Sequence, residues 1–143
     1  MNKWNTTGKI KAILLVIVAL PNLFAPMAVP VEQDLIMAVF PLIVGSLAIP
    51  LIAKLNAAFR GKEIVQPTWN DNPLDRKRTL DFFHFASYFF IAVGLSVLIG
   101  SAIKYQMFNL LGLTVISFGL GMLIGIWVTL KLMKRKNLRE DGN

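Results

Sequence analysis

The sequence predicts an all-α membrane protein in which four transmembrane helices form an up-down bundle with both termini in the cytoplasm. Of its 143 residues, 55% are hydrophobic and only 16% are charged. A soluble domain carries about 25% charged residues and covers much of its surface with polar groups. The apolar residues are gathered into four blocks separated by polar segments, so lipid is the expected solvent.

The four blocks cover residues about 10–29, 35–54, 80–103 and 108–131. Each is close to the ~20 residues that a helix needs to cross ~30 Å of hydrocarbon. The residues about 55–79 form the only long polar connection, which we expect to be a cytoplasmic loop. The chain is therefore predicted to be a single transmembrane domain over residues 1–143.

The first block resembles a signal peptide in part, because lysines precede it and Pro21 interrupts it. The small residues around Ala25 and Ala28 do not have the spacing that a cleavage site requires. We expect an uncleaved helix. In the second block, Pro41 and Pro50 predict bends, which persist in a membrane where neighbouring helices satisfy the freed carbonyl groups.

A helix start is predicted within the polar connection, ahead of the third block. Asn72 is a favourable N-cap residue, Pro73 fits the first helical position, and Asp75 would face the positive end of the helix dipole. This pattern predicts that helical structure begins in the cytoplasm, before the chain enters the lipid.

The basic residues are distributed unevenly between the two sides that the blocks define. Fourteen of the fifteen Lys and Arg residues lie in the two terminal segments and in residues 54–79, whereas Lys104 lies on the opposite side. Lys and Arg favour the cytoplasmic side, so we expect both termini inside a bacterial-type inner membrane, close to anionic headgroups. Cations at block edges do not form the basic face that nucleic acid requires. The imbalance also argues against insertion in both orientations.

Small residues recur every four positions in the third and fourth blocks, which is the spacing of one helix face. Such residues allow helices to pack closely in lipid, and we expect the two stripes to face each other. Alternatively, one stripe, or Gly112 and Gly119 on another face, docks a partner helix or a second copy. The stripes are Ala92, Ser96 and Gly100 in the third block, and Ser117, Gly121 and Gly125 in the fourth.

The sequence offers little support for catalysis or for a cofactor. Ionisable residues mark ion and proton paths in membranes, but here they lie only at the ends of the blocks. His84 is the only histidine, with Asp81 and Tyr88 at helical spacing. Asp71 and Asp75 match no metal-loop spacing, so they are expected to form caps and turns. We predict no catalytic residue, no cofactor and no metal.

The segment 66–74 is the most individual part of the sequence, with two prolines, three Asx residues and one tryptophan. It is expected to be a turn on the membrane surface, either a linker with one interfacial anchor or a docking surface. The candidate docking or interface residues are Trp69, Asn70, Asp71, Asn72, Asp81 and His84.

These observations predict a non-enzymatic membrane protein that acts through helix–helix contacts within the bilayer. It would be an accessory subunit or a toxin-immunity-type protein, with another membrane protein or itself as partner. The alternative is a channel or transporter for a small solute, built as a parallel oligomer. An interfacial lipid enzyme using Asp71, Asp75, Asp81 or His84 is the least favoured class.

Overall fold

The computed structural model describes residues 4–24, 35–106 and 108–141, which fold almost entirely into helices. Apart from an isolated bridge between Glu63 and Arg78, no β-structure occurs in these three segments. The helices are α1 (Thr6–Phe24), α2 (Leu35–Arg60), α3 (Leu80–Tyr105) and α4 (Leu110–Asp141).

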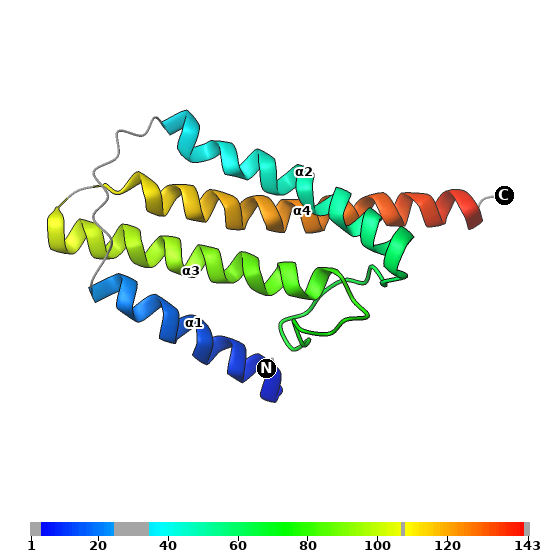
Figure 1. Ribbon diagram of the computed structural model, residues 1–143, viewed down its shortest axis with the longest axis horizontal. Helices are drawn as coiled ribbons and strands as arrows, with labels where there is room; N and C mark the ends of the chain where they lie inside the picture. Colours follow the sequence, from blue (N-terminus) through cyan, green and yellow to red (C-terminus); the bar gives the residue numbers. More distant parts are fainter. Residues whose placement is uncertain (1–3, 25–34, 107, 142–143) are drawn as a thin grey trace.

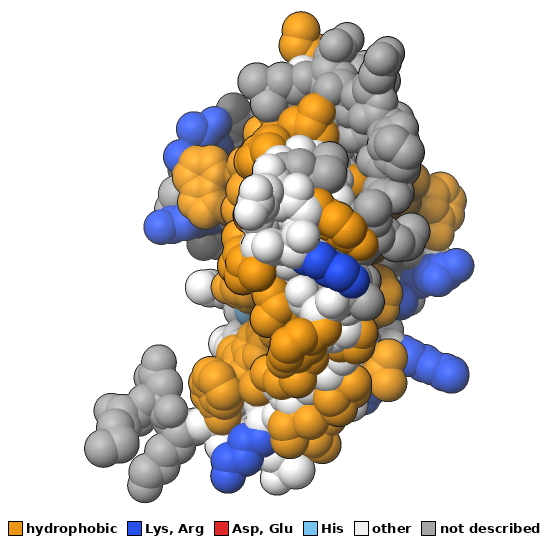
Figure 2. Space-filling model, turned by 90° about the vertical axis from the view of Figure 1, so that its left-hand side faces the viewer, with side chains coloured by type: hydrophobic (Ala, Val, Ile, Leu, Met, Phe, Trp, Pro, Cys, Tyr) orange, Lys and Arg blue, Asp and Glu red, His pale blue; other side chains and the backbone are white. Residues whose placement is uncertain are grey.

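All four helices are long and apolar enough to cross a membrane. The prediction of an all-α chain with four membrane-spanning helices is confirmed to this extent. Large hydrophobic side chains are exposed along every helix. They also make up much of the described surface at the end of the bundle that faces the viewer in Figure 2. In water this surface would be unfavourable, whereas in hydrocarbon it is the expected exterior.

The helices lie side by side in the order α1, α3, α4, α2 (Figure 1). α4 packs against both α2 and α3, and α3 also packs against α1. Among the described residues, every other pair of helices makes at most a marginal contact. The bundle is therefore an open row, in which α1 and α2 each have one neighbour.

The contact between α3 and α4 is antiparallel and depends on glycines. Gly94 of α3 lies against the Gly112 carbonyl group of α4, and Gly119 of α4 lies against the Ser87 carbonyl group of α3. A Cβ atom added to any of these glycines would come within 2.9 Å of the opposite helix. Gly112 and Gly119, the alternative docking face, are thus packed within the chain.

The two predicted stripes of small residues do not face each other, which corrects the expected pairing. Gly100 lies against the Leu23 carbonyl group of α1, whereas Gly121 and Gly125 lie against α2. The residues that join α3 to α4, such as Gly94, are displaced from the stripes by two positions. Two positions correspond to about 200° around a helix, so they lie on the opposite side.

The other stripe residues also lie within the row. The Ser96 hydroxyl group donates to the Ala92 carbonyl oxygen at 2.8 Å, within α3. Ser117 of α4 is 5% exposed. The stripes therefore join the central pair of helices to the outer ones.

The helices of the structure extend beyond the apolar blocks. α2 continues to Arg60 instead of ending near residue 54, and α4 continues to Asp141 instead of residue 131. α1 begins at Thr6, four residues before the predicted start, and residues 25–29 of the prediction lie outside the described residues. Hydropathy detects the apolar part of a helix, whereas helical structure also includes the polar residues that follow or precede it.

The predicted helix start at Asn72 is wrong, because α3 begins at Leu80. The Asn72 side chain accepts a hydrogen bond from the Leu74 backbone N–H at 2.9 Å, and Asp75 accepts one from the Lys77 N–H at 2.9 Å. These short-range bonds form consecutive turns, which is the alternative use of Asn and Asp before a helix.

Candidate functional site

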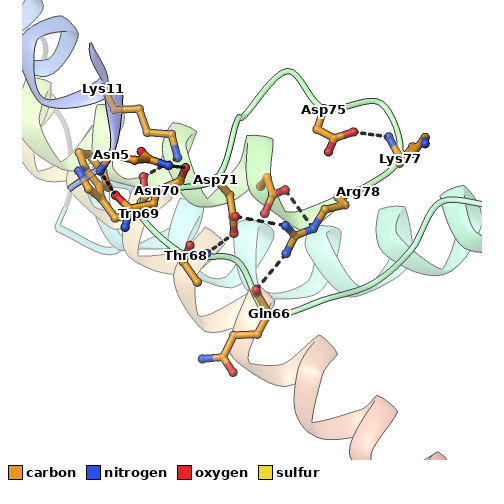
Figure 3. Close-up of polar contacts among 11 residues, drawn as sticks. Asn5, Lys11, Gln66, Thr68, Trp69, Asn70, Asp71, Asp75, Lys77 and Arg78 are labelled. Atoms are coloured by element: carbon orange, nitrogen blue, oxygen red, sulfur yellow. Dashed lines mark hydrogen bonds and ion pairs between the residues drawn. The ribbon is translucent and has the colours of Figure 1, made fainter. Parts of the chain in front are cut away.

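The most elaborate polar arrangement lies where the loop of residues 61–79 folds over the first turns of α1 and α3 (Figure 3). Its two ends are held together, because the Glu63 N–H donates to the Lys77 carbonyl oxygen at 2.8 Å and the Thr79 N–H donates to Glu63 at 3.2 Å. Gly61 ends α2 with a φ of 62°, which glycine adopts without strain. We call the residues that join this loop to the helices the polar cluster: Asn5, Lys11, Trp69, Asn70, Asp71, Arg78 and Asp81.

The loop is bonded directly to the start of α1. The Asn5 backbone N–H donates to Asn70 Oδ1 at 3.0 Å, and Asn5 Nδ2 donates to the Asn70 carbonyl oxygen at 2.9 Å. The Trp69 indole N–H donates to the Gly8 carbonyl oxygen at 3.0 Å. A Cβ atom on Gly8 would lie 2.6 Å from Asn70 Oδ1. Any larger residue at position 8 would therefore prevent the loop from approaching α1 this closely.

Lys11 is the charged centre of this contact and is only 2% exposed. Its Nζ atom donates to the Trp69 carbonyl oxygen at 3.1 Å. The same atom lies 5.4 Å from the centre of the Trp69 ring and 5.8 Å from that of Phe85, within the range of cation–π attraction. A buried cation requires such compensation, because it has lost its hydration.

Trp69 occupies the space between α1 and α3. Its ring centre lies 5.8 Å from that of Trp4 and 5.5 Å from that of Tyr88, the latter edge-on. Phe85 is 6.5 Å away. Tilted and edge-on pairs at these separations are favourable, so the loop is anchored by an aromatic group as well as by hydrogen bonds.

Arg78 connects the loop to α3. Its guanidinium group forms ion pairs with Asp71 at 3.2 Å and Asp81 at 3.3 Å, and donates to the Gln66 carbonyl oxygen at 3.2 Å. Asp71 also accepts the Thr68 N–H at 2.8 Å. Burial opposes ionisation of Asp71, but the bonds from Thr68 and the charge of Arg78 outweigh it and hold the pKa of Asp71 below its ordinary value.

Asp81 and His84 lie in the first turns of α3. Asp81 is 1% exposed, and its carboxylate forms an ion pair with the guanidinium group of Arg78. The His84 ring lies edge-on to that of Tyr88, with 5.0 Å between the centres. Within the part of the chain that the structure describes, no three histidine or carboxylate side chains gather to form a group that would hold a metal ion.

The structure separates the candidate docking residues into inward and outward groups. Trp69 and Asn70 are bonded to α1, and Asp71 and Asp81 are paired with Arg78. Asn72 lies on the exposed side of the loop, while His84 is half-buried beside Tyr88.

Sequence reasoning missed three residues that hold the polar cluster together: Asn5, Lys11 and Arg78. One feature of the sequence pointed to the contact at α1: a lysine lies three residues after a glycine at the start of an apolar block. This spacing places Gly8 and Lys11 on one helix face, although it does not identify the loop that covers them. Comparisons with known protein families, with curated proteins and with solved structures find no match for the chain.

Proposed function

We propose that the chain is a non-enzymatic integral membrane protein that binds another membrane protein through helix–helix contacts within the bilayer. The open row of helices is the observation that carries this proposal. α1 and α2 each pack against one neighbour, and both are long enough to span the membrane. Their outer sides are therefore available to a helix of another protein, in the role of an accessory subunit or of a toxin-immunity-type protein.

The two sides of α2 differ in the way that such a role requires. Gly45, Ile49 and Ala53 are buried and belong to the side that faces α4. Leu47 and Leu51 lie on the outer side and are 68% and 60% exposed. Because the outer side carries large apolar residues, it is compatible with lipid and also with the packing of a partner helix.

The polar groups buried among the helices support binding over transport. The hydroxyl groups of Ser46 and Thr129 donate to the carbonyl oxygens four residues earlier in their own helices, at 2.7 Å each. Thr114 and Ser96 are bonded in the same way. A hydroxyl group that donates within its own helix has used its only proton, so it cannot donate a hydrogen bond to a passing solute.

We further propose that both termini face the cytoplasm of a bacterial-type inner membrane, where anionic headgroups attract the basic residues. The distribution of Lys and Arg supports this orientation. The bonds between Asn5 and Asn70 support it as well, because they require the start of α1 and the basic loop to lie on one side.

Photo-crosslinking in native membranes tests the partner proposal. A photoreactive residue at Leu47 on α2, or at Ile17 on α1, which is 57% exposed, should give an adduct with one particular membrane protein. Ile49 is the matched control, because it is 2% exposed and faces α4. It should give no adduct with another chain. Replacing Leu51 by Asn should weaken the Leu47 adduct if both residues contact the same partner helix.

The two remaining outcomes contradict the proposal. Adducts between copies of this chain would favour a parallel oligomer, whose solute flux in liposomes would then be measured. Adducts with lipid alone at both positions would show that the outer sides face only the bilayer. If a partner is captured, loss of its assembly upon deletion of this chain indicates an accessory subunit, whereas protection against a membrane-inserting toxin indicates an immunity-type protein.

A further inference from the structure

A cleft of about 210 Å³ lies between the end of α2, the loop and the start of α3. Its lining includes Asn56 of α2, Lys62, Leu74 and Thr79 of the loop, and Phe82 of α3. The apolar span of α2 ends here, and the apolar span of α3 begins here. The cleft, which we call the loop cleft, is therefore located at the boundary between the lipid and the water. It is distinct from the contact between α1 and the loop.

Two cations of the loop cleft have no ion-pair partner among the side chains that the structure describes. Lys62 and Arg76 line the cleft and form no salt bridge there. Arg78 also lines it, but its charge is compensated by Asp71 and Asp81. Asp75 is the one acidic residue of the lining. The uncompensated charge of the cleft is thus positive.

A buried hydroxyl group provides an independent indication of a ligand. Thr79 lines the loop cleft and is 3% exposed, and its Oγ1 atom has no hydrogen-bond partner in the described part of the chain. Thr79 precedes α3, where a threonine commonly caps the helix, yet it makes no side-chain capping bond. Buried polar groups are nearly always bonded. Rotation of the Thr79 side chain toward the cleft would bring this hydroxyl group to a ligand oxygen.

The apolar part of the lining indicates what kind of anion would bind. Phe82 is 52% exposed and Leu74 is 77% exposed, and both border the cleft. A free phosphate ion would leave these side chains without a role. A phospholipid would place its phosphate near Lys62, Arg76 and Thr79, and its acyl chains along the apolar residues.

From these observations we infer that the loop cleft binds the headgroup of an anionic phospholipid, with Lys62 and Arg76 contacting the phosphate and Phe82 contacting the acyl chains. This inference goes beyond the proposed binding of a partner protein and does not depend on it. A protein without a partner would still retain the lipid, and a protein that binds a partner could lack the lipid site.

Lipid retention by the purified full chain tests the inference. The protein is incubated in detergent with phosphatidylglycerol or with phosphatidylcholine, and the bound lipid is counted by native mass spectrometry. We expect one phosphatidylglycerol molecule to be retained in preference to phosphatidylcholine. Lys62→Gln combined with Arg76→Gln should reduce this retention roughly tenfold, since each cation near an anionic headgroup contributes appreciably to binding.

The matched control changes two other cations by the same substitutions. Lys134 and Arg135 are exposed on α4 and lie outside the loop cleft, so Lys134→Gln with Arg135→Gln should leave retention unchanged. Thr79→Val removes the hydroxyl group and should weaken retention without unfolding the chain, because the hydroxyl has no partner to lose. Circular dichroism verifies the fold of each variant.

Three results would overturn the inference. Equal loss of lipid in both double variants would indicate general attraction to the basic surface. Equal retention of the two lipids would show that the headgroup charge is not recognised. Displacement of the lipid by low concentrations of inorganic phosphate would show that the cleft recognises phosphate alone, without the acyl chains.

Discussion

Lys11 lies in an apolar helix, yet its charged group is one of the most buried in the described part of the chain. The residue links three elements, since it belongs to α1, donates to the loop and lies over the ring of Phe85 in α3. Its role is therefore to hold α1 in place. A lysine is suited to this role, because its long stem can cross the apolar contact and carry the charge to the loop.

Replacing Lys11 by Met should weaken the attachment of α1 while preserving the shape of the side chain. The variant loses a hydrogen bond from a charged group, and we expect a decrease of about 1.5–3 kcal/mol in the free energy of unfolding. Titration with sodium dodecyl sulfate in mixed micelles, followed by circular dichroism, measures this. Lys9→Met is the control, because Lys9 is exposed on the same helix and should have little effect. Equal effects of the two variants would contradict the role assigned to Lys11.

Asp71 should make the stability depend on pH in a defined direction. Its pKa is lowered in the folded chain from the ordinary value of 3.8. A lowered pKa means that the ionised group stabilises the fold above the unfolded pKa, and that this contribution disappears as the pH falls through the folded pKa. Asp71→Asn should therefore be less stable than the natural chain near neutral pH.

The difference between the two proteins should decrease as the pH falls below 3.8. Thermal unfolding in detergent at several pH values measures it, with Asp75→Asn as a control, because Asp75 is exposed and forms no ion pair with Arg78. A constant difference over the whole range would exclude ionisation of Asp71 as the cause.

The sequence indicated part of the polar cluster and missed the rest. Trp69 and the Asx residues stood out because their composition is unusual between apolar blocks. Their contact with α1 could not be predicted, because Asn5 and Asn70 are 65 positions apart and polar residues show no periodicity that would relate them. Arg78 appeared to be one of several loop cations until the structure placed two carboxylates beside it.

Among the helices, glycines determine which surfaces can meet. Gly121 is the strongest example, because an added Cβ atom would overlap the carbonyl oxygen of Leu42 in α2. The obstructing atom belongs to the backbone, so a change of rotamer cannot relieve the overlap. α2 has no other substantial neighbour in the described structure, and it therefore depends on this contact.

Gly121→Ala should separate α2 from α4 and reduce the free energy of unfolding by about 1–3 kcal/mol, as expected for overpacking. Leu120→Ala is the matched control, since Leu120 is the adjacent residue of α4 and is 42% exposed. Unfolding in mixed micelles compares the two. A smaller effect of Gly121→Ala than of Leu120→Ala would show that α2 is not held at this position.

Four-residue spacing defines the two stripes of small residues, but it does not identify the helix that each stripe meets. The stripe through Gly100 faces α1, and the stripe through Gly121 faces α2. Spacing defines a face of one helix, and each helix of the central pair has two packed faces. Only the arrangement of all four helices determines which face meets which neighbour.

At the scale of the whole molecule, the orientation in the membrane can be tested by cysteine labelling. The sequence contains no cysteine, so each introduced cysteine is the only thiol that can react. Single cysteines at Lys104, Arg76 and Arg135 occupy exposed positions. In spheroplasts, a membrane-impermeant maleimide should label only the cysteine at position 104. After permeabilisation it should label all three. If the cysteine at position 104 and those at positions 76 and 135 are all labelled in intact spheroplasts, the chain inserts in two orientations, which would contradict the proposed topology.

The order of the helices in the row differs from their order along the chain, and this has a consequence for biosynthesis. α1 leaves the ribosome first, but its neighbour α3 emerges only after α2. α2 in turn waits for α4, the last helix to be made. The first two helices therefore do not pair with each other, and among the described residues only α3 and α4 pack as consecutive helices. α1 and α2 would each remain without their neighbour in the translocon or the lipid until α3 and α4 are inserted, which a membrane helix tolerates because its backbone hydrogen bonds are satisfied within the helix.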